Sequence, residues 1–495
     1  MPRCEIPECY SINTDIQSFL KNSLPKISCW PGRCMMSQIR RFLDLQIPST
    51  QNHLVKQLGE ALFLIAFFVF TFNSWLGLTG NKTLLFLDLN HFKKICYGIV
   101  LICLCTKAVL QKYKVKHLLL LGLAGGLLAI SSRYSSSKTL VWIFLFILTA
   151  QGLSLISLAF ILIVSLILIG ILTFGRYASG TISDFILNAS GSRGIRHSMG
   201  FTHPNTLAIY LFTICLVCLT LKRWAVRWFD AITCLILALF TYRITGSRTS
   251  TICFFVIILV IFYLLVIQPK LKPNFKVRFE KTITSLIAAL SLAIAFFSII
   301  ALFLFNPKIR FWSITDSLSS GRFHLMHSYY EKYGLTLLGN NYSKAPAQSY
   351  SLHGEPIRFV VDNLFARLIL QNGILIGSAG IAILLYCEWK LLKAPKTIFI
   401  SYSLFIIIGL MEALCLWLYV DFFVLAIASI IYSQNPDYLN STNSILERVW
   451  LYRFLTGRPY RQHGRHHPPI KTHFPRNFNH RQENNLFHPA HASKN

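Results

Sequence analysis

The chain has 495 residues, of which 54% are hydrophobic and 14% are charged, and its formal net charge at pH 7 is +29. A soluble domain has about 45–50% apolar and about 25% charged residues. The apolar residues also fall into long blocks, many of about 17–25 residues, which is the length that a helix needs to cross a membrane. Because no water satisfies backbone groups in lipid, these blocks are predicted to be helices, and a soluble architecture is excluded.

The predicted fold is an all-α integral membrane protein, a polytopic bundle of about twelve transmembrane helices. The predicted spans in chain order are 58–78, 95–111, 117–131, 138–154, 156–174, 204–221, 229–245, 249–268, 282–305, 362–387, 396–414 and 416–433. Segments 1–57 and 434–495 flank this membrane domain, and both are basic. We expect them to be cytoplasmic, with the tail disordered near anionic lipid and no nucleic-acid partner.

Lys and Arg in the short loops set the orientation of such a bundle, because cytoplasmic loops carry an excess of them. Under this span assignment the basic loops fall on the same side as both termini. These loops are 112–116, 222–227, 270–281 and 390–396. The sequence therefore predicts a multi-pass protein of the plasma or inner membrane with both termini in the cytoplasm. Segments 175–203 and 306–361 would then face outward, and the second is long enough to suggest a functional loop.

Four predicted helices begin at the outer face with polar residues. His203 and Asn205 flank Pro204, a residue suited to the first helical turn. Segment 246–250 (Gly-Ser-Arg-Thr-Ser) joins two spans, and segment 319–322 (Ser-Ser-Gly-Arg) precedes an amphipathic helix that ends at Gly334. The fourth start is 362–363 (Asp-Asn).

Helix N-termini bind anions through free backbone N–H groups, and arginine suits phosphate because its planar fork donates two hydrogen bonds. Arg248 and Arg322 each lie at such a start. If the starts converge, they form an outward-facing site for phosphate or pyrophosphate. The alternative is that each arginine anchors its helix to head groups. Arg196 and His203 are weaker candidates, since either could be satisfied by neighbours in its loop.

Asn363, Arg367 and Gln371 recur every four residues and are predicted to share one helix face. Arg367 would lie about one turn inside an apolar helix, where an ionisable group usually faces a polar interior. Glu412 is its expected counter-ion. A structural Arg367–Glu412 pair and a direct substrate role are both open at this point.

Several familiar catalytic patterns are missing from the sequence. The first outer loop has no Asp-X-Asp metal motif, and neither a P-loop nor a Gly-X-Ser-X-Gly motif occurs. We therefore expect no metal and no cofactor.

The sequence resembles the polysaccharide polymerase and O-antigen ligase family, especially the Wzy-type exopolysaccharide polymerases of Gram-positive bacteria. The matching text is Gly-Phe-Thr-His-Pro-Asn at 200–205, Thr-Gly-Ser-Arg-Thr-Ser at 245–250, Ser-Gly-Arg at 320–322 followed by Leu-Leu-Gly at 337–339, and Val-Asp-Asn at 361–363 leading to Leu-Gln-Asn-Gly-Ile at 370–374. The motifs also occur in the family's order around one large outer loop. The resemblance covers roughly residues 58–433.

This resemblance implies a membrane-embedded glycosyltransferase of the C class that uses undecaprenyl-pyrophosphate-linked oligosaccharide as donor. Arg248 and Arg322 would hold the pyrophosphate leaving group. A base near the end of loop 306–361 would deprotonate the acceptor hydroxyl, and the candidates are Asp362, His353 and Glu355. Ligases typically carry a histidine where this chain has Asp362, a departure that favours a polymerase.

The expected reaction is a metal-independent, inverting transfer in which arginines and helix starts stabilise the departing anion. Membrane lipid, a flippase and a chain-length regulator are the partners that this reading implies. The main rival is a flippase for the same lipid-linked sugar. A flippase should place polar groups near mid-membrane and show internal repeats, whereas the charges here gather at the outer boundary and no repeat is seen. An O-antigen-type ligase is the other alternative.

Overall fold

The computed structural model describes residues 53–84, 87–135, 137–188, 194–346, 349–350, 356–357, 359–432 and 446. The longer helices of this part are α3 His53–Leu76, α4 Leu89–Leu110, α5 Val115–Ser135, α6 Thr139–Thr149, α7 Leu155–Ala178, α8 Pro204–Leu221, α9 Trp228–Phe240, α10 Arg248–Phe262, α11 Pro273–Leu304, α12 Arg310–Ser319, α13 Arg322–Tyr333, α14 Leu364–Leu391 and α15 Lys396–Ile408. The short helical turns are Thr241–Thr245 and Tyr263–Ile267 (both π), Gln268–Lys270, Tyr342–Lys344, Ala413–Leu416 and Phe422–Leu425 (all 3₁₀), and α16 Ala426–Ile431.

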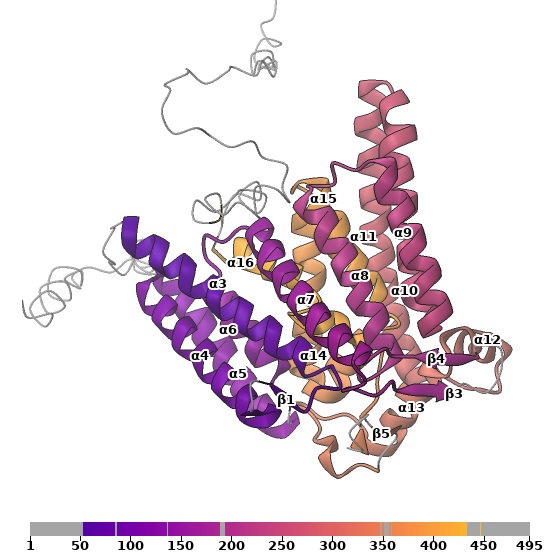
Figure 1. Cartoon of the computed structure of the whole chain (residues 1–495), viewed down its shortest axis with the longest axis horizontal. Helices are drawn as coiled ribbons and strands as arrows, with labels where there is room; N and C mark the ends of the chain where they lie inside the picture. Colours follow the sequence, from indigo (N-terminus) through magenta and orange to yellow (C-terminus); the bar gives the residue numbers. More distant parts are fainter. Residues whose placement is uncertain are drawn as a thin grey trace, which may run out of the picture. The chain divides into compact units, whose positions relative to one another are not determined.

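The long helices form a bundle whose two sides are tilted differently in the view of Figure 1: α3 and α4 run obliquely, whereas α9, α10 and α11 stand nearly upright. Figure 1 shows α3, α4 and α5 on one side, α9, α10 and α11 on the other, and α14 between them. Helix α3 packs against α4 and α7, α9 packs against α10, and α11 packs against α14 and α15. One continuous core of buried apolar side chains joins them. The predicted all-α class is confirmed for the described residues.

Eight of the described helices are long and apolar enough to cross a membrane. They are Leu54–Leu76, Val115–Ser135, Leu155–Ala178, Pro204–Leu221, Trp228–Thr245, Arg248–Lys270, Pro273–Leu304 and Leu364–Leu391. Three other expected spans coincide with shorter apolar helices, and the remaining one lies in α4, whose 22 residues include three lysines. The count of twelve spans therefore stays a prediction. The terminal segments 1–57 and 434–495 lie outside the described residues, except for 53–57 and Leu446.

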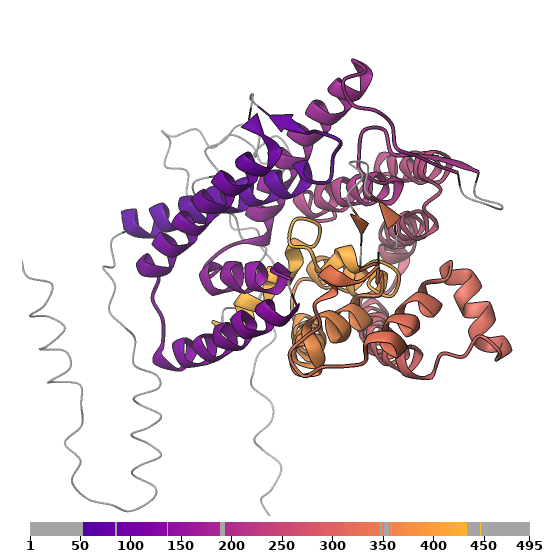
Figure 2. The same ribbon diagram turned by 90° about the horizontal axis from the view of Figure 1, so that it is seen from below.

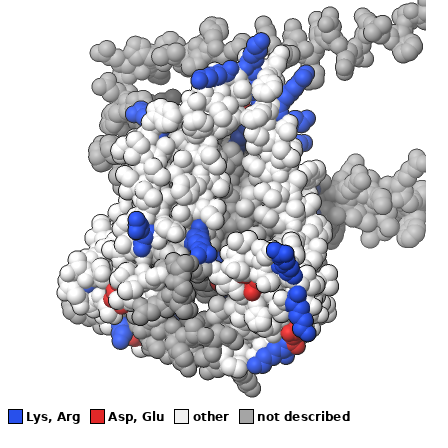
Figure 3. Space-filling model, turned by 90° about the vertical axis from the view of Figure 1, so that its right-hand side faces the viewer, with Lys and Arg blue, Asp and Glu red and all other residues white. Residues whose placement is uncertain are grey.

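On the face of the bundle shown in Figure 3, charged side chains avoid the middle. Figure 3 shows lysines and arginines at the upper end, a broad belt largely free of charge below them, and a second charged zone at the lower end. A belt of this kind fits the hydrocarbon layer of a membrane, where charged groups are costly. Which end faces outward stays a prediction from the loop charges.

Three two-stranded antiparallel hairpins complete the described part. They are β1 Thr83–Leu84 with β2 Leu87–Asp88, β3 Ile186–Asn188 with β4 Ile195–His197, and β5 Ser349–Tyr350 with β6 Pro356–Ile357. In the second hairpin Leu187 lies opposite Arg196. The expected loop 306–361 holds α12 and α13, which lie side by side at one edge in the view of Figure 2.

Helix α14 is broken at Gly373, where the backbone has φ 84° and ψ 166°. A neighbouring segment satisfies the backbone groups that the break releases: Ile374 donates to the Thr336 carbonyl at 2.9 Å. A Cβ at position 373 would lie 2.5 Å from the Gly339 nitrogen, so only glycine fits. The break separates a short N-terminal arm, 364–372, from the longer part of the helix.

Candidate functional site

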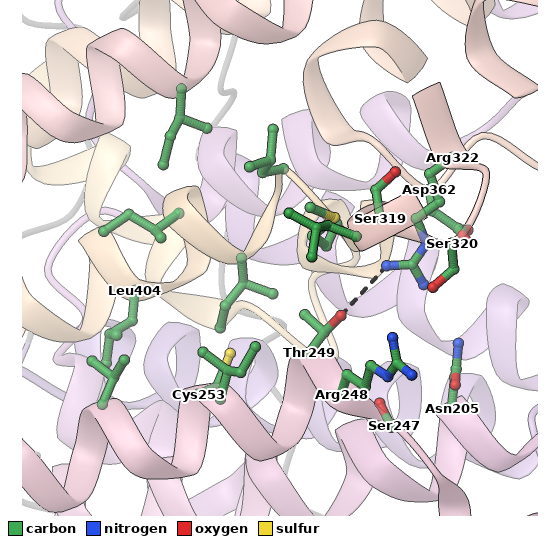
Figure 4. Close-up of a pocket in the computed structure, with 18 of the residues that line it drawn as sticks. Asn205, Ser247, Arg248, Thr249, Cys253, Ser319, Ser320, Arg322, Asp362 and Leu404 are labelled. Atoms are coloured by element: carbon green, nitrogen blue, oxygen red, sulfur yellow. Dashed lines mark hydrogen bonds and ion pairs between the residues drawn. The ribbon is translucent and has the colours of Figure 1, made fainter. Parts of the chain in front are cut away.

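A cavity of about 810 Å³ opens between α10, α11 and α15 and reaches the starts of α8, α13 and α14. Its two ends differ in chemistry. The polar end is lined by Arg196, Asn205, Gly246, Ser247, Arg248, Thr249, Ser319, Ser320, Gly321, Arg322 and Asp362. The other end is lined by aliphatic side chains, among them Val256, Val260, Ile287, Leu290 and Leu404. Figure 4 shows the polar side chains gathered at one side and the aliphatic ones extending away from them.

The expected polar helix starts do converge on the polar end of this cavity. Helix α8 begins at Pro204 with His203 as its N-cap, α10 begins at Arg248, and α13 begins at Arg322. The N-cap of α14 is Asn363, whose side chain accepts a hydrogen bond from the Ala366 N–H at 2.8 Å. The sharp turn before α13 uses left-handed backbone at Ser320 and Gly321. The predicted clustering of Arg248, Arg322 and Asp362 is thus present.

Arg322 is the most constrained cation of the site. Its Nη2 lies 2.8 Å from Glu412 Oε1, and its Nε lies 3.1 Å from Asp362 Oδ2. Its Nη1 donates to Thr249 Oγ1 at 3.4 Å, the dashed line in Figure 4. Burial disfavours the charged guanidinium, but Glu412 and Asp362 outweigh it and raise the pKa of Arg322. Arg322 is therefore a permanently charged group held between two carboxylates.

The two carboxylates differ in exposure. The Glu412 side chain is 4% exposed, whereas the Asp362 side chain is 34% exposed and lines the cavity. Glu412 thus fixes Arg322 from behind. Asp362 contacts Arg322 from the side that a ligand in the cavity would occupy.

Arg196 reaches the same region from the β3–β4 hairpin. Its Nη2 donates to Asn205 Oδ1 at 2.6 Å and its Nε donates to the Thr245 carbonyl at 2.5 Å. Thr245 ends the π-helical turn that follows α9. Turns of this kind interrupt the ordinary hydrogen-bond pattern and often mark functional sites. Gly246 follows with φ 59°, and a Cβ there would lie 3.0 Å from Arg196 Nε.

His203 lies beside this cluster without lining the cavity. Its Nδ1 accepts the Asn205 N–H at 3.1 Å. Burial and, next, the charge of Arg196 lower the pKa of His203 to about 4. The imidazole is therefore neutral near pH 7, as its role of hydrogen-bond acceptor at the N-cap requires.

The expected Arg367–Glu412 pair is wrong. Glu412 Oε1 lies 2.8 Å from Arg322 Nη2, because the start of α13 meets the segment after α15 at the polar end of the cavity. Arg367 instead donates from Nε to Gln371 Oε1 at 3.1 Å.

The predicted shared face of the tenth span is correct for Arg367 and Gln371, which bond to each other. Arg367 also lies over the Phe359 ring, 5.5 Å from its centroid. Asn363 does not share that face. It caps the helix and its Nδ2 donates to Ser298 Oγ at 2.9 Å.

Of the three candidate bases, only Asp362 can be located. His353 and Glu355 lie outside the described residues. In the ranges that the structure describes, no three His, Cys, Asp or Glu side chains are grouped closely enough to hold a metal ion.

Sequence reasoning missed Asp184, which fixes the hairpin that carries Arg196. Asp184 Oδ1 accepts the N–H groups of Ser198 at 2.9 Å and Met199 at 2.8 Å, and Oδ2 lies 2.6 Å from His197 Nδ1. Burial opposes ionisation, but these hydrogen bonds hold the pKa of Asp184 below its usual value. No local signal in the sequence gives this role, because Asp184 bonds to backbone N–H groups 14 and 15 residues along the chain.

Comparison of this chain with known protein families, with curated proteins and with solved structures finds no match.

Proposed function

We propose that this protein is a polysaccharide polymerase that transfers a growing oligosaccharide from undecaprenyl pyrophosphate onto a hydroxyl of another lipid-linked repeat unit. The observation that carries the proposal is the two-ended cavity, with three arginines and an accessible carboxylate at one end and an aliphatic channel at the other. A lipid diphosphate has this same division. Its anionic head would meet Arg196, Arg248 and Arg322, while its isoprenoid chain would lie along α10, α11 and α15.

The charges of the polar end suit a diphosphate. Three guanidinium groups and two carboxylates, Asp362 and Glu412, leave a net positive charge there before a ligand binds. Arginine forks and the start of α10 offer hydrogen-bond donors aimed at the cavity. Such pre-oriented donors stabilise the charge that develops on a departing diphosphate, because they need no reorganisation during the reaction.

Asp362 would act as the general base after an exchange of partners. A diphosphate oxygen can replace Asp362 at Arg322 Nε, since both are anionic acceptors and Asp362 is the more exposed of the two carboxylates. Glu412 would keep its contact and hold the guanidinium in place. The released carboxylate would then be available to an acceptor hydroxyl at the same end of the cavity.

The reaction balances with these groups alone. The acceptor hydroxyl oxygen attacks the anomeric carbon of the donor sugar and forms the new glycosidic bond. The bond from that carbon to the diphosphate oxygen breaks, and undecaprenyl pyrophosphate leaves with the electron pair. The hydroxyl proton passes to Asp362. Attack from the side opposite the leaving group inverts the anomeric centre.

The test is chain extension by the purified full-length protein supplied with lipid-linked repeat units and followed on gels. Arg248→Ala and Arg322→Ala should each abolish extension, and Arg322→Ala should also lower the unfolding midpoint, because Glu412 is left buried without its cation. Arg243→Ala is the matched control, because Arg243 lies five residues before Arg248 but is exposed and does not line the cavity. Full activity of both cavity variants would refute the site.

Three further measurements test metal dependence and the two alternative functions. Activity that a chelator abolishes would contradict metal-independent transfer. Movement of lipid-linked sugar between leaflets without any lengthening would identify a flippase instead. Transfer onto a lipid A core would identify a ligase.

A further inference from the structure

Helix α12 presents three distinct faces. At about 100° per residue, Phe311, Ile314 and Leu318 fall on one narrow arc of the helix. Arg310, Ser313 and Ser317 fall on a second arc, and Trp312 and Ser319 fall on a third.

Trp312 and Asp316 fix α12 to its neighbours in the fold. Trp312 is buried and stacks on Phe297 of α11, with ring centroids 5.8 Å apart and an interplanar angle of 25°. The carbonyl of Asp316 accepts the Gly321 N–H at 2.9 Å, and its carboxylate accepts the His324 N–H at 2.9 Å. Helix α12 is therefore a fixed element of the fold.

The arc of Phe311, Ile314 and Leu318 is largely uncovered by the described residues, although one edge of the Phe311 ring packs against Phe297, with ring centroids 6.4 Å apart. Phe311 is 56% exposed, Ile314 is 51% exposed and Leu318 is 71% exposed. Ile309, which directly precedes the helix, is 49% exposed. Exposed apolar patches of this kind mark a surface that contacts a protein, a ligand or a membrane.

The surroundings of this arc point to lipid. Helix α11 is long and apolar enough to span a membrane. Its exposed side chains Phe296, Ile300 and Leu304 lead to its end, and five residues separate that end from the start of α12. The apolar surface of a membrane-spanning helix thus continues onto α12. Lys308 and Arg310 lie at the junction, both exposed. Basic residues beside an apolar helix face are typical of helices that lie in the membrane interface and attract anionic lipid head groups.

We propose that α12 lies in the membrane interface, with the arc of Phe311, Ile314 and Leu318 inserted among the lipid chains and Lys308 and Arg310 at the head groups. Leu318 belongs to this arc and also lines the cavity. The lipid-embedded helix therefore forms part of the cavity rim, and it sets that rim at the level of the leaflet. A membrane lipid reaches the cavity past Leu318 from the side, without passing through water. This inference does not depend on the reaction proposed above.

The test uses the photoreactive residue p-benzoylphenylalanine in the full-length protein, reconstituted in nanodiscs of phosphatidylethanolamine and phosphatidylglycerol. This photoreactive residue replaces Ile314 in one variant. In the matched control it replaces Ser317, which lies on the second arc of the same helix. After irradiation, intact mass is measured. We expect lipid adducts at position 314 and far fewer lipid adducts at position 317.

Other outcomes would overturn the proposal. A crosslink from position 314 to a second copy of the chain would make the arc an oligomer interface. Absence of any adduct at position 314, or equal lipid labelling at both positions, would show that α12 is not inserted. A shift in the melting temperature of either variant relative to the unmodified protein identifies misfolding, and Phe311 and Ser313 then provide a second pair of positions on the same two arcs.

Discussion

The two carboxylates that flank Arg322 should respond differently to neutralisation. We expect Glu412→Gln to destabilise the fold more than Asp362→Asn, and Asp362→Asn to damage the reaction more. The contrast follows from the geometry at Arg322: one partner is buried behind the guanidinium and the other is partly open to the cavity.

The magnitudes can be worked from the contacts. Glu412 is 4% exposed and lies 2.8 Å from Arg322 Nη2. Hydrogen bonds to charged groups contribute about 1.5–3 kcal/mol, and we expect Glu412→Gln to cost an amount in that range because the amide still offers one oxygen. Asp362 is 34% exposed, and pairs open to solvent are worth about 0.2–1 kcal/mol. As the proposed general base, Asp362 should nevertheless account for about 10²–10⁴-fold in rate.

Stability is measured by reversible unfolding of each variant in mixed micelles, followed by circular dichroism. Activity is measured as chain extension at saturating and at limiting concentrations of the lipid-linked donor. Glu331→Gln is the control, because the Glu331 side chain is 68% exposed and far less buried than either site carboxylate. Glu412→Gln should raise KM for the lipid-linked donor, since Arg322 loses its fixed position. If Asp362→Asn costs more stability than Glu412→Gln, or leaves kcat unchanged, the assignment of clamp and base fails.

Three further predictions follow from the polar end of the cavity. Gly246→Ala should lower the free energy of unfolding by about 1–2 kcal/mol, which is the cost of left-handed backbone for a residue with a Cβ. It should also weaken donor binding, because the new methyl group meets Arg196. An unchanged unfolding midpoint would contradict this. Arg248→Lys should keep the fold and raise KM for the lipid-linked substrate, since lysine keeps the charge but cannot donate two parallel hydrogen bonds. Equal KM values would show that Arg248 acts only as a charge. Because the pKa of His203 is lowered to about 4, its contribution to stability is fully present above the unfolded value of about 6.5 and is lost as the pH falls towards 4. His203→Asn keeps an N-cap acceptor but does not titrate, so the loss of stability that comes from protonation of His203 should disappear in this variant. Unfolding midpoints of both proteins at pH 7 and pH 5 measure this difference.

The positions of the helix starts could be predicted from the sequence because local chemistry determines them. Pro204 in the first turn and Gly334 at a helix end act through their own backbone preferences, and the structure has both where expected. That Arg248, Arg322 and Asp362 lie at one face of the bundle was also predictable, because each follows a polar break there. Whether they share one site was left open, because that depends on how the helices pack.

The partners of the site residues could not be predicted, because they are separated by long stretches of chain. Arg322 and Glu412 are 90 residues apart, and Arg196 and Thr245 are 49 apart. Arg367 was the expected partner of Glu412 because both lie near the outer ends of apolar spans. The folded structure instead brings Glu412 Oε1 within 2.8 Å of Arg322 Nη2.

The break at Gly373 divides α14 into two lengths of helix whose phases are set separately. Asp362 lies just before the N-cap of the N-terminal arm, and the longer part crosses the bundle down to Leu391. Apart from Arg367 and Gln371, every residue of the arm is buried, so the arm is held by its own packing. The direction of the Asp362 carboxylate therefore depends on how this short arm packs and not on the path of the longer part across the bundle.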